Sequence, residues 1–217
     1  MKLKRSAAAR RRKPKNLALP SDFYDREPAV VARELIGKRL VRQTTEGITA
    51  GWIVETEAYL SAGDPACHAA RGKTVRNAAM FGPPGVAYVY MIHSRWCFNV
   101  VTEREGTPSA VLLRAIEPAI GQDIMAARRG VSRPQEIARG PAKLCAAMEI
   151  DRSFNGHDLT RGEALWIDDG PASGAIWNQV ASPRIGISSA QELMLRFFAV
   201  DNRFVSRPHW SRQFVAK

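Results

Sequence analysis

The sequence predicts one α+β domain built on an antiparallel sheet. Strand-like runs rich in β-branched and aromatic residues follow one another with few helical segments between them. Two of these runs, residues 38–44 and 49–59, are separated by the turn-forming segment TEGI, which is typical of a hairpin. The chain has 217 residues, which suits one sizeable core. This order of elements is unlike the regular alternation of a βαβ fold.

The first 20 residues are expected to form a basic, disordered arm, with a single domain in residues 21–217. Residues 1–15 hold eight of the 32 basic residues and no acidic one, whereas the rest of the chain is close to charge balance. A run of like charge is usually solvated, and a basic one commonly contacts nucleic acid. A solubilising tail and an organelle-targeting peptide are the two alternatives.

A helix is predicted next, followed by the hairpin and by a long loop. Asp25 is the expected N-cap, Pro28 lies in the first turn and Gly37 ends the helix. Residues 60–84 lack a regular pattern, and loops of this length in compact domains are usually functional or mobile. Later strands are expected at residues 85–93, 95–102, 109–118, 163–170, 184–188 and 195–200, and helices at 119–130 and 140–150.

Two glutamates on one strand are the first candidates for function. In an extended strand, Glu55, Glu57 and Tyr59 share one face, and the opposite face is more apolar. A face with two carboxylates is not ordinary core, because burying a carboxylate without a partner is costly. The carboxylates therefore either face water or line a cleft.

Aromatic and basic residues on later strands offer further candidates. Tyr88 and Tyr90 alternate in the same way, so they either pack on the sheet or form a stacking platform for a flat ligand such as a base. His93 and Arg95 lie near a predicted hairpin tip, where they are either solvated turn residues or nucleic-acid contacts. Arg114 interrupts an apolar run and must therefore pair with a carboxylate or reach an anion.

The composition also excludes several classes of protein. The three cysteines form no disulfide framework, and Cys67 beside His68 lacks the spacing of a zinc site, so no metal and no organic cofactor are expected. No apolar run is long enough for a membrane span, and the N-terminus lacks the apolar core of a signal peptide. An intracellular protein is therefore expected.

Several motifs together resemble the 3-methyladenine DNA glycosylase family of the alkyladenine type. They are RELIGKRLVR, IVETEAY, ACHAARGKTVRNAAMFGPPGVAYVY, CFNVV, AVLLRAIEP and ARGPAKLCAAMEI, in order from about residue 22 to about residue 205. The resemblance implies a curved antiparallel sheet and a hairpin that probes the minor groove of DNA. It also implies a monomeric, monofunctional hydrolase that flips a damaged purine out of double-stranded DNA and cleaves its bond to deoxyribose, with no lyase step.

The resemblance assigns roles to particular residues. Glu57 corresponds to the catalytic base of the family, and Arg114 helps to hold the attacking water. The expected pocket for the flipped base is formed by Tyr59, His68, Tyr90 and Asn99. The residue types suit the chemistry, since a carboxylate stabilises an oxocarbenium-like sugar and aromatic faces hold a flipped base.

The resemblance fails at the hairpin tip. Family members usually carry tyrosine, glycine and methionine after YVY, whereas this chain reads YVYMIHSRWCFN, with His93 near the place of the wedge tyrosine and Arg95 beside it. A weaker or altered preference for duplex DNA is therefore expected. The alternative function is a non-catalytic or RNA-directed nucleic-acid binding protein on the same scaffold.

Overall fold

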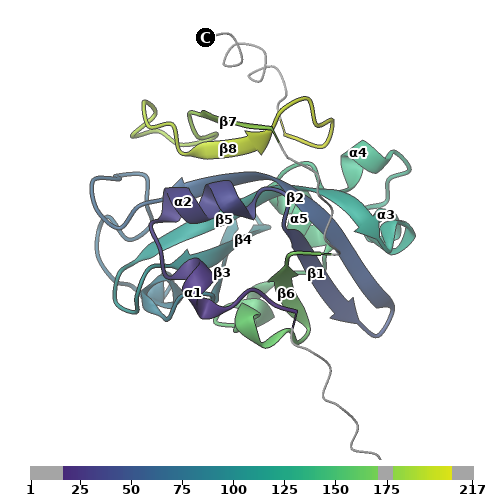
Figure 1. The fold of residues 1–217 in the computed structure, drawn as a ribbon, viewed down its shortest axis with the longest axis horizontal. Coiled ribbons are helices and arrows are strands. Elements are labelled where there is room, and N and C mark those ends of the chain that lie inside the picture. The colour runs from purple at the N-terminus through teal and green to yellow at the C-terminus, as the bar shows by residue number, and fades with distance from the viewer. Residues whose placement is uncertain (1–16, 171–177, 207–217) are drawn as a thin grey trace, which may run out of the picture.

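A computed structural model of the chain describes residues 17–170 and 178–206, so most of the predicted basic arm lies outside the described residues. In the described part, an antiparallel sheet has the strand order β3-β4-β5-β2-β1-β6, with β8 paired to β2 and β7 paired to β8. Few helices flank this curled sheet, as Figure 1 shows. The strands are β1 (Arg39–Thr44), β2 (Gly47–Tyr59), β3 (Ala87–Ile92), β4 (Arg95–Thr102), β5 (Ser109–Ile120), β6 (Leu165–Asp168), β7 (Gln179–Ser182) and β8 (Arg196–Ala199). The predicted α+β class and the single domain around a curved antiparallel sheet are confirmed.

Strand β2 is the centre of the sheet and explains its curvature. One edge of β2 pairs with β5, while the other pairs first with β1 and then, from Glu55 to Glu57, with β8. The register of β2 against β5 shifts between Ile53 and Glu55 and again between Glu55 and Thr56. Such bulges bend a strand and increase its twist. A further shift lies between Ala50 and Gly51, and the two shifts on either side of Glu55 bend the strand just before Glu57.

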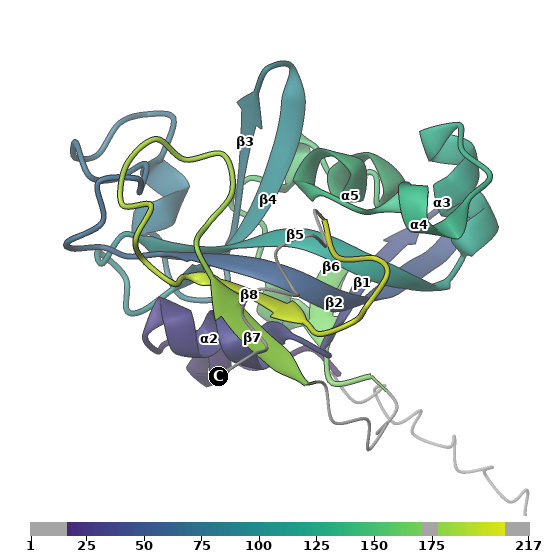
Figure 2. The same cartoon turned by 90° about the horizontal axis from the view of Figure 1, so that it is seen from above.

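Helices cover both faces of the sheet, as Figure 2 shows. Helix α2 (Pro28–Leu35) packs on one face, and α3 (Gln122–Arg129), α4 (Pro134–Ile137) and α5 (Pro141–Ala147) lie on the other. The remaining elements are the short helix α1 (Ser21–Tyr24) and the 3₁₀ turns η1 (Ala78–Phe81), η2 (Arg152–Phe154) and η3 (Leu159–Arg161). A continuous core of buried apolar side chains fills the space between the sheet and the helices.

The predicted start of the first long helix is wrong by two residues. Glu27, not Asp25, is the N-cap of α2, and its carboxylate accepts hydrogen bonds from the backbone N–H groups of Ala29 and Val30. Pro28 takes the first helical position, where its fixed φ suits the helix and no hydrogen bond is lost. Asp25 instead ends the separate short helix α1.

The strand predicted at residues 184–188 is also wrong. These residues form an irregular segment directly after β7, and Gly186 has a φ of 78°. The backbone N–H of Ile185 donates to Glu57, and the guanidinium of Arg184 is buried against Asp64. Both groups are therefore bonded to side chains instead of belonging to a strand ladder.

The ends of the described chain are fixed by specific contacts. Ala18 forms a β-bridge with Asp168, and the N–H of Leu19 donates to the carbonyl of Ile167, so the fold begins before residue 20.

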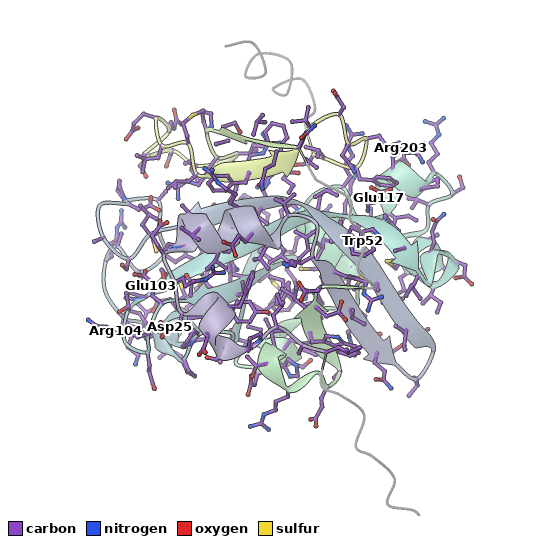
Figure 3. The ribbon with its side chains drawn as sticks, in the orientation of Figure 1. Asp25, Trp52, Glu103, Arg104, Glu117 and Arg203 are labelled. Carbon is purple, nitrogen blue, oxygen red and sulfur yellow. The ribbon has the colours of Figure 1, made fainter. Side chains whose placement is uncertain are left out.

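Two residues after β6, Gly170 has a φ of 67°, and a Cβ atom there would lie 2.5 Å from the ring of Trp52. Trp52 of β2 and its register partner Glu117 of β5 lie on the same side of the molecule in Figure 3. Only glycine therefore fits at position 170 without a shift of this tryptophan.

No helix in the described ranges has the length and apolar character needed to cross a membrane.

Candidate active site

Glu57 is fully buried at the bend of β2 and accepts three hydrogen bonds. Its Oε2 atom accepts from the hydroxyl of Tyr59 at 3.1 Å and from Nη1 of Arg114 at 3.1 Å. Its Oε1 atom accepts from the backbone N–H of Ile185 at 2.7 Å. Glu57 is thus held by β2, by β5 and by the irregular segment after β7.

Glu55 is also fully buried but has a different set of partners. Its Oε1 atom accepts from Nε of Arg114 at 2.9 Å, Nε of Arg196 at 2.7 Å and the hydroxyl of Ser206 at 2.8 Å. Its Oε2 atom accepts from the backbone N–H of Ser206 at 2.7 Å. Burial alone would raise the pKa of Glu55, but the two guanidinium groups outweigh burial and hold the pKa below its ordinary value. The solvent-facing interpretation of the two glutamates is therefore wrong.

Arg114 joins the two carboxylates. It is buried on β5, and it donates to Glu55 through Nε and to Glu57 through Nη1. Burial would lower the pKa of Arg114, but Glu57 and Glu55 raise it, so the guanidinium stays charged. Of the two predicted alternatives for Arg114, a carboxylate partner or an anion, the structure shows the carboxylate partner.

A cavity of about 360 Å³ lies next to this cluster. Its volume is within the range of small-molecule sites. Five of the predicted site residues line it, namely Tyr59, His68, Tyr90, Asn99 and Arg114. Glu57 is not itself part of the lining, but its three hydrogen-bond donors, Tyr59, Arg114 and Ile185, all line the cavity.

Aromatic rings form one side of the cavity. The rings of Tyr88 and Tyr90 have centroids 5.3 Å apart and planes inclined by 31°, and the ring of His68 meets Tyr90 edge-on at 4.4 Å. Nδ1 of His68 lies 2.9 Å from the hydroxyl of Tyr88. Burial raises the pKa of Tyr88 to about 12, so this hydroxyl is neutral at physiological pH. The cavity therefore offers aromatic faces to a flat ligand, together with polar side chains such as Asn99 and Arg114.

Asn99 and Ile92 complete this wall. Asn99 on β4 is buried and its amide donates to the carbonyl of Tyr88 at 3.0 Å, which fixes the orientation of the side chain. Ile92, at the end of β3, lines the mouth of the cavity and is 46% exposed. Ile92 follows Tyr88 and Tyr90 in the alternation of one strand face, which is the signal that could have predicted its place.

The predicted DNA-probing hairpin is formed by β3 and β4, which project from the body of the molecule in Figure 2. The turn consists of His93 and Ser94, with φ values of 46° and 57°. Two consecutive residues with positive φ are typical of the tight turns that join twisted strands. His93, Arg95 and the preceding Met91 are exposed. His93 and Arg95 thus lie at the tip and outside the cavity.

Sequence reasoning missed the contribution of residues 185–189. This segment lines the cavity, and the backbone N–H of Ile185 donates a hydrogen bond to Glu57. Backbone contacts leave little trace in side-chain patterns, so this role has no signal in the sequence. Among the described residues, no group of three histidine, cysteine, aspartate or glutamate side chains is arranged to hold a metal ion.

Comparison with known proteins gives a consistent result. The family of methylpurine-DNA glycosylases matches residues 22–203. The chain is 53% identical over 180 residues to a protein of Methanocella arvoryzae, covering 82% of this chain and 88% of that one. It is 47% identical over 192 residues to a protein of Carboxydothermus hydrogenoformans, covering 88% of this chain and all of that one. Both proteins are named as candidate 3-methyladenine DNA glycosylases.

Proposed function

Since the chain belongs to the methylpurine-DNA glycosylase family and is a hydrolase of the N-glycosidic bond, we propose that it excises alkylated or deaminated purines of the 3-methyladenine type from double-stranded DNA. The proposal includes flipping of the damaged base and activation of water by Glu57. The observation that supports it most is the buried Glu57–Arg114 ion pair beside an aromatic cavity that Arg114 lines.

The cavity is the proposed site of the flipped base. A base that leaves the duplex loses its stacking, and aromatic side chains in an enzyme pocket replace it. Tyr59 and Tyr90 line the cavity and supply such faces, while His68 and Asn99 are close enough to the same surface to contact polar edges of the base. An alkylated purine that carries positive charge also gains from stacking on the electron-rich faces of these rings.

Glu57 is the proposed base for the attacking water. An ionised carboxylate offers about four acceptor positions, and Tyr59, Arg114 and Ile185 fill three of them. The fourth position suits a water molecule. Glu57 takes a proton from this water as its oxygen bonds to C1′ of the sugar, while the C1′–N bond breaks and the base leaves with the bonding electron pair. The negative charge of Glu57 also stabilises the oxocarbenium-like sugar, and Arg114 holds the carboxylate in place.

The products are expected to be a free base and an intact strand with an abasic site. A strand-cleaving step needs an amine that forms a Schiff base with the sugar. None of the described residues that line the cavity is a lysine. The proposed reaction is therefore monofunctional hydrolysis. The hairpin tip with His93 and Arg95 is the proposed contact to the duplex, and a monomer is expected to suffice.

The experiment is to incubate the enzyme with duplexes that contain 3-methyladenine, 7-methylguanine or hypoxanthine and to measure the released base by chromatography. We expect release of at least one of these bases, with strands that break only after alkali treatment. The same base attached to ribose is the control, because the 2′-hydroxyl disfavours the cationic sugar. Tight duplex binding without release would instead support a non-catalytic binding protein, and preferred release from ribose would support an RNA-directed enzyme.

A further inference from the structure

A buried ion pair joins two irregular segments that line the cavity. One segment is the loop after β2, which contains Asp64, and the other follows β7 and contains Arg184. Nη1 of Arg184 lies 2.6 Å from Oδ2 of Asp64, and Nη2 lies 2.7 Å from Oδ1. Both side chains are completely buried. This paired geometry fixes the two groups in one plane and not merely at one distance.

Each partner also holds the backbone around it. Asp64 accepts from the backbone N–H groups of Leu60 at 3.0 Å and Ala66 at 3.1 Å, so it organises the start of its own loop. Nη1 of Arg184 donates to the carbonyl of Ala58 at 3.0 Å. The pair therefore ties both segments to the end of β2, where Glu57 and Tyr59 lie.

The same ion pair lies next to the proposed functional groups, Tyr59 and Glu57. The guanidinium carbon of Arg184 lies 4.7 Å from the centroid of the Tyr59 ring. The residue that follows Arg184 is Ile185, whose backbone N–H donates to Glu57 at 2.7 Å. A displacement of Arg184 would thus change both the donor on Glu57 and the support of the Tyr59 ring.

We propose that the Asp64–Arg184 ion pair is a positioning device for the glycosylase site. By holding Arg184 against Tyr59 and Ala58, the pair fixes the N–H of Ile185 on Glu57 and presents the ring of Tyr59 to the flipped base. This inference rests on the proposed function of Glu57. Neither residue of the pair lines the cavity, so the pair acts through Tyr59 and Ile185 and does not touch the base.

Stability alone does not account for this pair. Burying two charges costs desolvation energy, and apolar side chains of similar volume often fill such a space equally well. Burial raises the pKa of Asp64, but the hydrogen bonds from Arg184 and from the backbone outweigh it, so the carboxylate stays ionised at neutral pH. What the pair supplies beyond packing is directional control of two irregular segments.

The test compares two double variants that each remove a paired arginine and aspartate. The clamp variant is Asp64→Asn with Arg184→Met. The matched control is Asp168→Asn with Arg39→Met, which removes the bidentate pair between β1 and β6, where neither residue lines the cavity. Single-turnover base release is measured over a range of enzyme concentrations, together with the melting temperature. This separates the maximal rate from the enzyme concentration that gives half of it.

The clamp variant is expected to lose roughly 10- to 100-fold in maximal rate, because small misplacements of reacting groups have effects of this size. Its half-saturating concentration should change less than about 3-fold, since its hairpin and surface charges are untouched. The control should keep its maximal rate. Arg184→Lys keeps the charge without the planar fork and should recover only part of the lost rate.

Two outcomes would overturn the inference. One is a folded clamp variant with the maximal rate of the wild type, and the other is an equal loss of rate in the control. Either result counts against the ion pair only if the wild type releases base and Glu57→Gln does not. If the wild type itself released no base, the proposed glycosylase function would be contradicted. That result differs from one in which the wild type is active and only the positioning role of the Asp64–Arg184 ion pair is contradicted.

Discussion

Glu55 and Glu57 lie two residues apart on β2 and have separate tasks. Glu55 is surrounded by Arg114, Arg196 and Ser206, and it ties the end of the described chain to the sheet. Glu57 shares only Arg114 with this set and otherwise contacts Tyr59 and Ile185 beside the cavity. We therefore assign stability to Glu55 and propose catalysis for Glu57.

Replacing Glu55 with Gln should destabilise the fold in a pH-dependent way. The change leaves Arg114 and Arg196 buried without this carboxylate, and breaking a buried pair in this way costs about 3–5 kcal/mol. The pKa of Glu55 is lower in the folded protein than its ordinary value. Its contribution is therefore present above the unfolded pKa and is lost as the pH falls through the folded pKa.

Urea unfolding at pH 7 and in steps below pH 4 measures this effect. The difference in unfolding free energy between wild type and Glu55→Gln should be largest at pH 7 and should shrink in acid. An equal difference at every pH would contradict the assignment.

His68 should be neutral at pH 7, and its titration should respond to Arg76. Partial burial of the ring, and then the positive charge of Arg76, lower the pKa of His68. Arg76→Gln removes that charge, so the pKa of His68 should rise. Nuclear magnetic resonance titration of the four histidines measures it, with the other three as internal controls. An unchanged titration of His68 would show that Arg76 does not act on the pocket.

At the scale of elements, the hairpin of β3 and β4 is where this chain differs most from the usual pattern of its family. The turn at its tip has only two residues, His93 and Ser94. The positive φ of His93 is adopted more readily by histidine than by β-branched or bulky side chains. Exposed Met91 and Ile92 precede it, so the tip combines an imidazole with apolar side chains. Such a tip can insert between bases, although its aromatic surface is small.

His93→Gly should lower excision from duplex DNA by roughly 10-fold, because stacking of an aromatic ring on a base contributes about 1–3 kcal/mol. Excision from single strands should not change, since no neighbouring base has to be separated. Ser94→Gly is the matched control, because it relaxes the same turn and keeps the imidazole.

His93→Tyr enlarges the wedge and should raise the ratio of duplex to single-strand excision. If neither His93→Gly nor His93→Tyr altered this ratio, the tip would not be the wedge.

Sequence patterns predicted the strands better than the loops. The runs at residues 95–102 and 195–200 became β4 and β8 because β-branched and aromatic residues are typical of a half-buried sheet. The pattern failed at residues 184–188, where two alternating isoleucines resemble a strand. Arg184 and Ile185 instead bond to side chains of other segments. The Asp64–Arg184 pair spans 120 residues, and no local pattern reports such a contact.

The candidate site was predictable only in part. Alternation placed Glu57 and Tyr59 on one strand face, and the apolar surroundings of Arg114 required a buried partner. The motifs added the candidates His68 and Asn99. The burial of Glu55 could not be predicted, because its partners Arg196 and Ser206 come from the far end of the chain.

At the scale of the whole molecule, positive charge is concentrated in the first 15 residues, outside the described part. Deleting residues 1–16 should weaken duplex binding and flatten its salt dependence, by about 0.9 in the slope of log K against log salt for each phosphate that the arm neutralises. Anisotropy titrations at several salt concentrations measure this slope. A scrambled arm of the same composition is the control and should restore it. An unchanged slope after deletion would leave the arm without a role in DNA binding.

The central claim is that Glu57 activates water for cleavage of the N-glycosidic bond. The most direct test is single-turnover release of base from a lesion duplex by wild type, Glu57→Gln and Glu55→Gln, each corrected for the folded fraction. We predict that Glu57→Gln loses roughly 10²-fold or more, as expected when a positioned general base is removed, while folded Glu55→Gln keeps most of its rate. Equal rates for wild type and Glu57→Gln would contradict the claim.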